Sequence, residues 1–160
     1  MITVSPAQPR DAAAIAVLLE ELGRYYGATE FEPLDRRIIQ INEAIFGHPP
    51  AAHALLARDG RQVAGLAAYS FLWPAVGATR SLYLKELYVL DAYRRLGIGR
   101  LLVRAVFETA AGLGCSRVEW TTDLGNTGAQ AFYAKLGLPD HPVKVFYRVE
   151  DTGSGLGPIG

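Results

Sequence analysis

The sequence predicts an α/β fold in which a mixed sheet is flanked by helices. Apolar residues recur at helical spacing in some segments, and in others they alternate with polar residues or run continuously. Turn residues separate these segments, so the predicted order is β-α-α-β-β-β-α-β-α-β. A chain of 160 residues, of which 50% are hydrophobic, has the length of one domain and can bury a core.

The N-terminal part of the chain is predicted to hold one strand and two helices. Residues 2–4 form a short strand that ends at Pro6. The first helix is expected to stop near Gly23, and the second to begin at Pro33 and to end at Gly47. The apolar residues that define these helices lie at helical spacing: Ile15, Leu18, Leu19 and Leu22, then Ile38, Ile39, Ile41, Ala44 and Ile45.

The middle of the chain has the pattern of strands. Residues 53–58 and 62–73 are two predicted strands joined by Asp59-Gly60, a dipeptide typical of a tight hairpin turn. Residues 80–90 are predicted to be the next strand of this meander.

The remaining elements alternate between helix and strand. One helix is predicted to begin at Gly97 and to end at Gly112, followed by a strand at residues 117–122. Asn126 is a good N-cap for another helix, which ends at Gly137.

The C-terminal residues complete the predicted domain. Residues 143–149 are expected to form a last strand of the sheet. We predict a single domain over residues 1–150 and a disordered, glycine-rich tail over residues 151–160.

The composition excludes several classes of protein. A formal net charge of zero argues against binding nucleic acid or an anionic membrane by bulk electrostatics. One cysteine excludes an internal disulfide framework, and with three scattered histidines it makes no metal site of recognisable spacing. No apolar run is long enough to span a bilayer, and the N-terminus lacks a secretory segment, so we expect a cytoplasmic protein.

A basic turn with two glycines stands between a predicted strand and the helix after it. Arg94, Arg95 and Arg100 surround Gly97 and Gly99. A strand that passes through such a turn into a helix directs backbone N–H groups and the positive end of the helix dipole at one spot, where a phosphate can bind. The spacing matches neither the dinucleotide-binding fingerprint nor the nucleotide P-loop. From these residues alone, a pyrophosphate site and an ordinary turn with a surface basic cluster both remain open.

The segment Arg94-Arg95-Leu96-Gly97-Ile98-Gly99 resembles the Arg/Gln-x-x-Gly-x-Gly/Ala loop of GCN5-related N-acetyltransferases. The strand Leu84-Lys85-Glu86-Leu87-Tyr88-Val89 before it and the segment Asn126…Ala131-Phe132-Tyr133…Gly137 after it are also similar to that family. The resemblance covers roughly residues 3–149 and implies the family's acyl-CoA N-acyltransferase fold, with acetyl-CoA as the acetyl donor. It implies cofactor contacts by these residues: Leu87, Tyr88, Val89, Arg94, Arg95, Leu96, Gly97, Ile98, Gly99, Arg100 and Asn126.

Acetyl transfer to an amine requires a deprotonated amine, stabilisation of an oxyanion and a proton for the departing thiolate. The resemblance makes Tyr133 the general acid, while helical spacing alone favours a packing role beside Ala129 and Phe132. Glu86 is the candidate base, or else a solvent-facing acid that pairs with Lys85 or an arginine. Asn126 is expected to cap its helix and, by resemblance, to contact the pantetheine arm. The resemblance also implies that the strand bulges near Leu87, where that arm inserts.

The pattern is closest to the diamine (spermidine/spermine) acetyltransferase branch of the family. That branch usually has two adjacent acids where this chain has Lys85 and Glu86. Because Lys85 reverses one of these charges, we expect a less charged amine than a polyamine, such as an amino acid, a small metabolite or a drug-like amine. The candidate substrate contacts are Tyr25, Tyr26, Glu30, Glu32, Trp73 and Trp120.

Two other functions stay open at this stage. A protein acetyltransferase would act on a lysine or an N-terminus and would need an open groove for a peptide. A non-catalytic acyl-CoA-binding module would keep Arg94 to Gly99 but would have no need for Tyr133 or Glu86. The family resemblance further suggests a homodimer.

Overall fold

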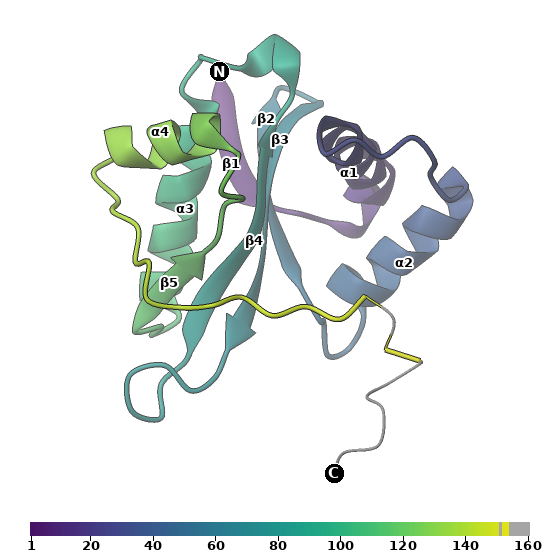
Figure 1. Cartoon of the computed structure of the whole chain (residues 1–160). Helices are drawn as coiled ribbons and strands as arrows, with labels where there is room; N and C mark the ends of the chain where they lie inside the picture. Colours follow the sequence, from purple (N-terminus) through teal and green to yellow (C-terminus); the bar gives the residue numbers. More distant parts are fainter. Residues whose placement is uncertain (151, 154–160) are drawn as a thin grey trace. The chain divides into compact units, whose positions relative to one another are not determined.

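The computed structural model describes residues 1–150 and 152–153, in two compact units, Met1–Thr121 and Thr122–Gly160. A five-stranded sheet forms the centre of the first unit (Figure 1). Its strands, in spatial order, are β1 (Ile2–Pro6), β2 (His53–Asp59), β3 (Gln62–Leu72), β4 (Ser81–Val89) and β5 (Arg117–Trp120). The first four strands pair antiparallel and β5 pairs with β4 in parallel, which confirms the predicted mixed sheet.

Helices cover both faces of this sheet. Figure 1 shows α1 (Ala12–Tyr25) and α2 (Leu34–Phe46) on one face and α3 (Ile98–Gly112) on the other. Alternation along the strands therefore produces two apolar cores. Leu56 is buried in the core under α1 and α2, and its neighbour Leu55 is buried in the core under α3.

A buried ion pair ties the start of α1 to the sheet. The two carboxylate oxygens of Asp11 accept hydrogen bonds from Arg58 Nη1 at 3.0 Å and Nη2 at 2.6 Å. The side chains are only 7% and 16% exposed, for Asp11 and Arg58 respectively. Asp11 also accepts the backbone N–H of Gln8 at 2.7 Å. Bidentate pairing of this kind fixes geometry as well as charge, so the helix start is anchored to β2.

Strand β4 carries a bulge and separates from β5 in its second half. Ala68 of β3 pairs with Glu86, and the next residue, Tyr69, pairs with Leu84, so Lys85 is an extra residue on β4. The parallel pairing with β5 ends at Leu84 and Trp120, while β4 continues to Val89. One edge of β4 is thus open beyond Leu84 among the described residues.

Among its described residues, the second unit contains one helix, α4 (Thr127–Lys135). Its N-cap is Asn126, whose Oδ1 accepts the backbone N–H of Ala129 at 3.0 Å. The predicted helix start and its cap are therefore confirmed.

Two predictions about element boundaries are wrong. Helix α1 continues past Gly23 to Tyr25, because the polar residues Arg24 and Tyr25 extend its last turn instead of starting a loop. Residues 143–149 are not a strand in the structure. Their apolar side chains are largely exposed, between 64% for Val149 and 86% for Tyr147, so alternation alone has not given this segment a pairing partner. Most of the predicted tail, residues 151 and 154–160, lies outside the described residues.

Within the described ranges 1–150 and 152–153, every helix falls short of the length and apolarity that crossing a bilayer would require.

Candidate active site

The turn after β4 has the backbone geometry of an anion-binding site. A short 3-10 helix (Asp91–Tyr93) follows the strand, and the chain then visits the left-handed region at Arg95 (φ 63°) and at Gly97 (φ 79°). Gly97 is the N-cap of α3, and its carbonyl accepts the N–H of Leu101 at 3.1 Å. The N–H groups of the first helical turn have no acceptor within the helix and point out of its N-terminus. Arg95 is the one described residue other than glycine with a positive φ, and such strain is concentrated at functional loops.

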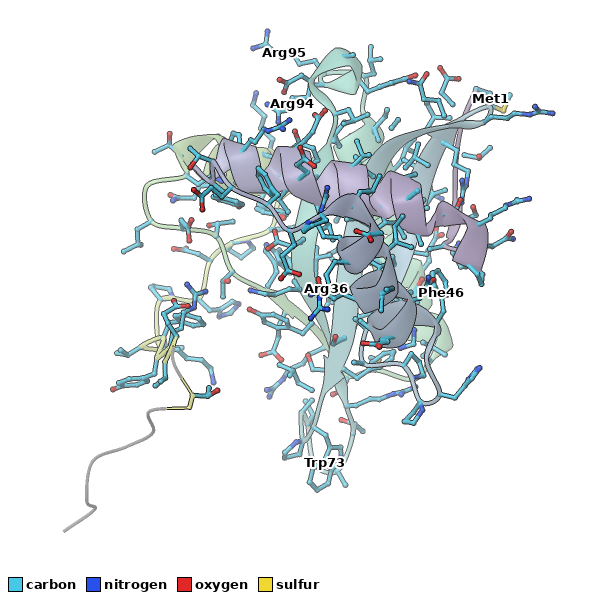
Figure 2. The ribbon with its side chains drawn as sticks, turned by 90° about the vertical axis from the view of Figure 1, so that its right-hand side faces the viewer. Met1, Arg36, Phe46, Trp73, Arg94 and Arg95 are labelled. Carbon is cyan, nitrogen blue, oxygen red and sulfur yellow. The ribbon has the colours of Figure 1, made fainter. Side chains whose placement is uncertain are left out.

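The arginines of this turn behave differently from one another. Arg95, Arg100 and the turn residue Leu96 are exposed. Figure 2 shows Arg94 and Arg95 at the end of the sheet opposite to Trp73, with Arg95 projecting outward. Arg94 instead binds its own strand and turn. Its Nε donates to the Val89 carbonyl at 3.1 Å and its Nη1 lies 2.8 Å from an Asp91 carboxylate oxygen.

The bulge in β4 decides which face each site residue occupies. Leu84, before the bulge, and Leu87 and Val89, after it, all pack in the core under α3. Tyr88 lies in the core under α1 and α2. Glu86 is two residues from Tyr88 and, because side chains alternate, shares its face. The structure therefore confirms a bulge in this strand, at Lys85, and directs Glu86 towards the side of α1 and α2.

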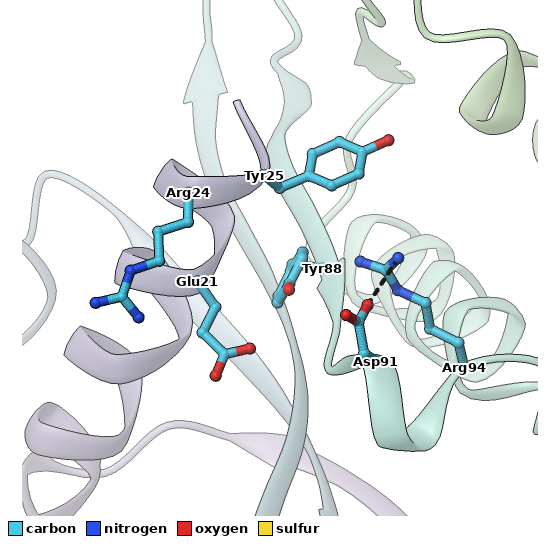
Figure 3. Close-up of a pocket in the computed structure, with 6 residues that line it drawn as sticks. All are labelled: Glu21, Arg24, Tyr25, Tyr88, Asp91 and Arg94. Atoms are coloured by element: carbon cyan, nitrogen blue, oxygen red, sulfur yellow. Dashed lines mark ion pairs between the residues drawn. The ribbon is translucent and has the colours of Figure 1, made fainter. Parts of the chain in front are cut away.

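A pocket of about 340 Å³ lies on that same face, beside the C-terminal end of α1. Its six lining residues are Glu21, Arg24, Tyr25, Tyr88, Asp91 and Arg94 (Figure 3). In Figure 3, Glu21 lies on one side of Tyr88, and Asp91 and Arg94 lie on the other. The volume is within the range of small-molecule sites.

Arg94 also contacts the aromatic wall of the pocket. Its guanidinium carbon lies 5.6 Å from the ring centre of Tyr25 and 5.5 Å from that of Tyr88, within the range of cation–π contact. Arg94 thus connects the end of α1, the end of β4 and the basic turn.

The environment of Tyr88 keeps its hydroxyl protonated. Burial raises the pKa of Tyr88 above the ordinary value of 10.0, and the nearby carboxylates of Glu21 and Asp91 raise it further, while Arg94 opposes them. The phenol is therefore a neutral hydrogen-bonding group on the pocket floor at physiological pH.

Only part of this pocket's lining was predicted to be functional. Tyr25 was predicted as a substrate contact and Tyr88 and Arg94 as cofactor contacts, whereas Glu21, Arg24 and Asp91 were not predicted. Glu21, Arg24 and Tyr25 are spaced i, i+3 and i+4, so their shared helix face could have been found once α1 was extended to Tyr25. Asp91 could have been found from its i, i+3 spacing to Arg94.

The other predicted substrate residues lie outside the pocket lining. The Tyr26 ring lies 5.3 Å from that of Tyr25, at the pocket's margin. Glu30 is exposed in the segment between α1 and α2, and Glu32 there accepts hydrogen bonds from Gln40. The Trp120 ring lies 6.1 Å from Phe107 of α3, so it packs on the opposite face of the sheet.

Two predicted site residues belong to the second unit. Asn126 caps α4, as described above. Tyr133, on the same helix, has its ring 5.1 Å from that of Phe132 in an edge-to-face arrangement. The roles of Tyr133 in catalysis and of Asn126 in cofactor binding stay predictions.

Comparison with known proteins adds the family context. A family model described as the acetyltransferase (GNAT) family matches residues 15–138. The chain is 30% identical to the thialysine N-epsilon-acetyltransferase of Mus musculus over 149 residues, which cover 86% of this chain and 84% of that protein. It is 36% identical to the L-ornithine N5-acetyltransferase of Arabidopsis thaliana over 75 residues, 47% of this chain and 33% of that protein.

The solved structures agree in fold. An integron cassette protein from the mobile metagenome of V. cholerae superposes with a TM-score of 0.85 at 24% sequence identity, and the match covers 96% of this chain and 94% of that protein. At this level of sequence identity, the match shows that the two proteins share a fold.

Proposed function

Because the chain belongs to the acetyltransferase (GNAT) family and is an acetyl-CoA-dependent N-acetyltransferase, we propose that it acetylates a primary amine of a small molecule by direct transfer in a ternary complex. The names of two relatives specify a side-chain nitrogen of an amino acid, thialysine or L-ornithine. These names support a free amino acid as the acceptor here. The reduced negative charge at Lys85-Glu86 supports the same choice over a polyamine.

The observation that carries the proposal is the open edge of β4 next to the anion-binding turn. Pairing with β5 ends at Leu84, so the backbone of Leu87 to Val89 is available on that side to an extended ligand. The pyrophosphate of acetyl-CoA would bind the free N–H groups at the start of α3, flanked by the exposed Arg95 and Arg100. Bound there, acetyl-CoA supplies the acetyl group as an activated thioester.

The protein then has three chemical tasks, two done by side chains and one by a backbone N–H. Glu86, on the face of α1 and α2, takes the proton of the acceptor ammonium, directly or through water. A backbone N–H near Leu87 donates to the carbonyl oxygen of the thioester. Tyr133 donates its proton to the departing thiolate, at the modest cost set by ordinary pKa values of about 10 for a tyrosine and about 8.5 for a thiol. Asn126 contributes a contact to the pantetheine arm beside its cap.

The first test is a thiol-release assay with acetyl-CoA and a panel of amines, each against a reaction without amine. The panel holds basic amino acids, polyamines, an aminoglycoside and a lysine peptide. We expect amine-dependent release of CoA with basic amino acids. Release only with the peptide would favour a protein acetyltransferase instead. Tight acetyl-CoA binding with no release for any amine would favour a non-catalytic acyl-CoA-binding module.

The second test addresses Tyr133. Tyr133→Phe should lower kcat by about 100-fold, the usual contribution of a general acid, and leave the Kd for acetyl-CoA nearly unchanged. Tyr147→Phe, at a tyrosine that is 86% exposed, is the matched control and should keep full activity. Equal kcat values for the two variants would remove Tyr133 from the mechanism.

A further inference from the structure

The pocket beside α1 has a charge pattern that suits a zwitterion. Its lining carries two carboxylates, Glu21 and Asp91, and two guanidiniums, Arg24 and Arg94. A polyamine would meet the two guanidiniums there, and a polyanion would meet the two carboxylates. Building on the acetyl transfer proposed above, we propose that this pocket binds the α-ammonium and α-carboxylate of an amino acid whose side-chain amine is the acetyl acceptor.

Glu21 is the group for the α-ammonium. It is half-buried in the pocket wall, and the described part of the chain supplies no hydrogen bond or ion pair to its carboxylate. Glu20, its neighbour, is by contrast engaged by Arg24 and by Arg37, the latter at 2.8 Å. A carboxylate without a protein partner, beside a buried phenol, is available to a cationic ligand group.

Arg94 is the group for the α-carboxylate. Its bonds to Val89 and Asp91 use two of the five N–H donors of a guanidinium, and its ring contacts with Tyr25 and Tyr88 hold its plane at the pocket. The ion pair with Asp91 is solvent-exposed, with side chains that are 43% and 81% exposed for Arg94 and Asp91, so a ligand carboxylate competes with it at small cost. Arg24 is turned away, towards Glu20 and the Phe31 ring at 5.4 Å.

The position of Glu86 sets the length of the acceptor. Glu86 and Tyr88 share a face of β4 and are two residues apart, which corresponds to about 6.6 Å along a strand. An amino acid whose head group lies over Tyr88 can therefore bring a side-chain amine to Glu86 across a stem such as the four-carbon stem of lysine. A side chain shorter than that of ornithine, or an α-amine as acceptor, would leave the reacting nitrogen at the pocket and away from Glu86.

The substrate test removes one head-group charge at a time. L-Lysine or L-ornithine, whichever is acetylated faster, is compared with the diamine and the ω-amino acid of equal length, cadaverine and 6-aminohexanoate or putrescine and 5-aminopentanoate. We expect kcat/KM for the amino acid to exceed each analogue by about tenfold, the effect of one lost charged hydrogen bond. Equal kcat/KM values for the three compounds would overturn the inference.

The variant test assigns each charge to its residue. Glu21→Gln should lower kcat/KM for the amino acid about tenfold while leaving the ω-amino acid, which lacks the α-ammonium, unchanged. Arg94→Gln should reduce the preference for the amino acid over the diamine. This ratio between two substrates cancels any effect of the variant on acetyl-CoA binding. Glu43→Gln, at an exposed position of α2, is the matched control.

Failure of this inference can be distinguished from failure of the proposed function. If the protein acetylates all the amines equally well and Glu21→Gln has no effect, the transferase function still holds but the head-group pocket is wrong. Calorimetry of L-lysine and L-ornithine binding gives a readout that does not need turnover. Binding that is lost in Glu21→Gln but kept in Glu43→Gln supports the pocket, and binding of neither amino acid to the wild-type protein overturns it.

Discussion

Two Asp–Arg pairs in this molecule have the same chemistry and opposite surroundings. Asp11 and Arg58 form a bidentate pair with side chains that are 7% and 16% exposed. Asp91 and Arg94 meet through a single nitrogen, with side chains that are 81% and 43% exposed. Both pairs lie at the junction of a helix with the sheet, so location in the fold alone does not separate them. The burial of the side chains and the number of bonds between them distinguish the two pairs.

This difference in burial decides in which pair a ligand can replace one partner. The carboxylate of Asp11 is fully occupied by Arg58 and by the N–H of Gln8, and no group could replace Arg58 without leaving a buried charge unpaired. The Asp91–Arg94 pair is solvent-exposed and contributes little stabilisation, so a ligand carboxylate can replace Asp91 as the partner of Arg94 at small cost in free energy. The first pair stabilises the fold, and the second keeps a binding group oriented.

The largest effect is expected for Asp11→Ala. This change leaves the Arg58 guanidinium buried without its partner, which typically costs about 3 kcal/mol of unfolding free energy. Urea denaturation of wild type and variant, followed by circular dichroism, measures the difference. A loss below about 1 kcal/mol, the level of an exposed pair, would erase the distinction between the two pairs.

Acidification should reduce the contribution of the buried pair. The hydrogen bonds from Arg58 hold the pKa of Asp11 below its ordinary value of 3.8, although burial acts in the other direction. A carboxyl whose pKa is lower in the folded state stabilises the fold above its unfolded pKa, and loses that contribution as pH falls through the folded pKa. The difference in unfolding free energy between wild type and Asp11→Asn should thus be constant above about pH 5 and should shrink below pH 3.8. A difference that grows on acidification would contradict this assignment.

Salt should act on the exposed pair and spare the buried one. Screening is effective at exposed charges and weak at buried ones. Raising the salt concentration from 0.05 M to 0.5 M should therefore raise KM for the amino acid several-fold while the coupling energy of Asp11 and Arg58, from a double-mutant cycle, stays constant. A salt-independent KM would mean that head-group charges do not guide binding.

The smallest effect is expected for Asp91→Ala on stability. Removing one partner of an exposed pair changes the unfolding free energy by a few tenths of a kcal/mol. The same urea titration as for Asp11→Ala provides the measurement, so the two aspartates are each other's controls. A loss comparable to that of Asp11→Ala would show that Asp91 anchors the turn, and would weaken the case for an exchangeable pair.

Local patterns in the sequence predicted most elements of the fold, including the strand, turn and helix around Gly97. The strand, turn and helix around Gly97 depend on residues that are close in sequence, and their periodicity and glycine spacing are visible there. The pocket depends on Glu21 and Asp91, which are far apart in the sequence and line one pocket only in the folded chain. No local pattern in the sequence shows that α1 and the turn after β4 line one pocket, although Glu21 lies within the predicted first helix.

Two further features could not be read from the sequence for the same physical reason. The alternation of Val143, Val145, Tyr147 and Val149 says which face would be apolar if a partner strand were present, but a strand exists only when its backbone is paired. The exact position of the bulge is likewise a matter of register between β3 and β4. Resemblance could suggest that a bulge occurs, and only the paired strands locate it at Lys85.

The bulge at Lys85 has a consequence for how this site can vary. Because a strand has a side-chain period of two, one additional residue reverses the facing of everything that follows it. Lys85 is itself exposed, so replacing it leaves the facing of its neighbours unchanged. Deleting it would exchange the environments of Glu86 and Leu87. The side chains of Glu86 and Tyr88 would then point into the apolar core under α3. The position is thus tolerant of substitution and intolerant of a change in length, so that sequence diversity among active variants should be found in the identity of residue 85 and never in its omission.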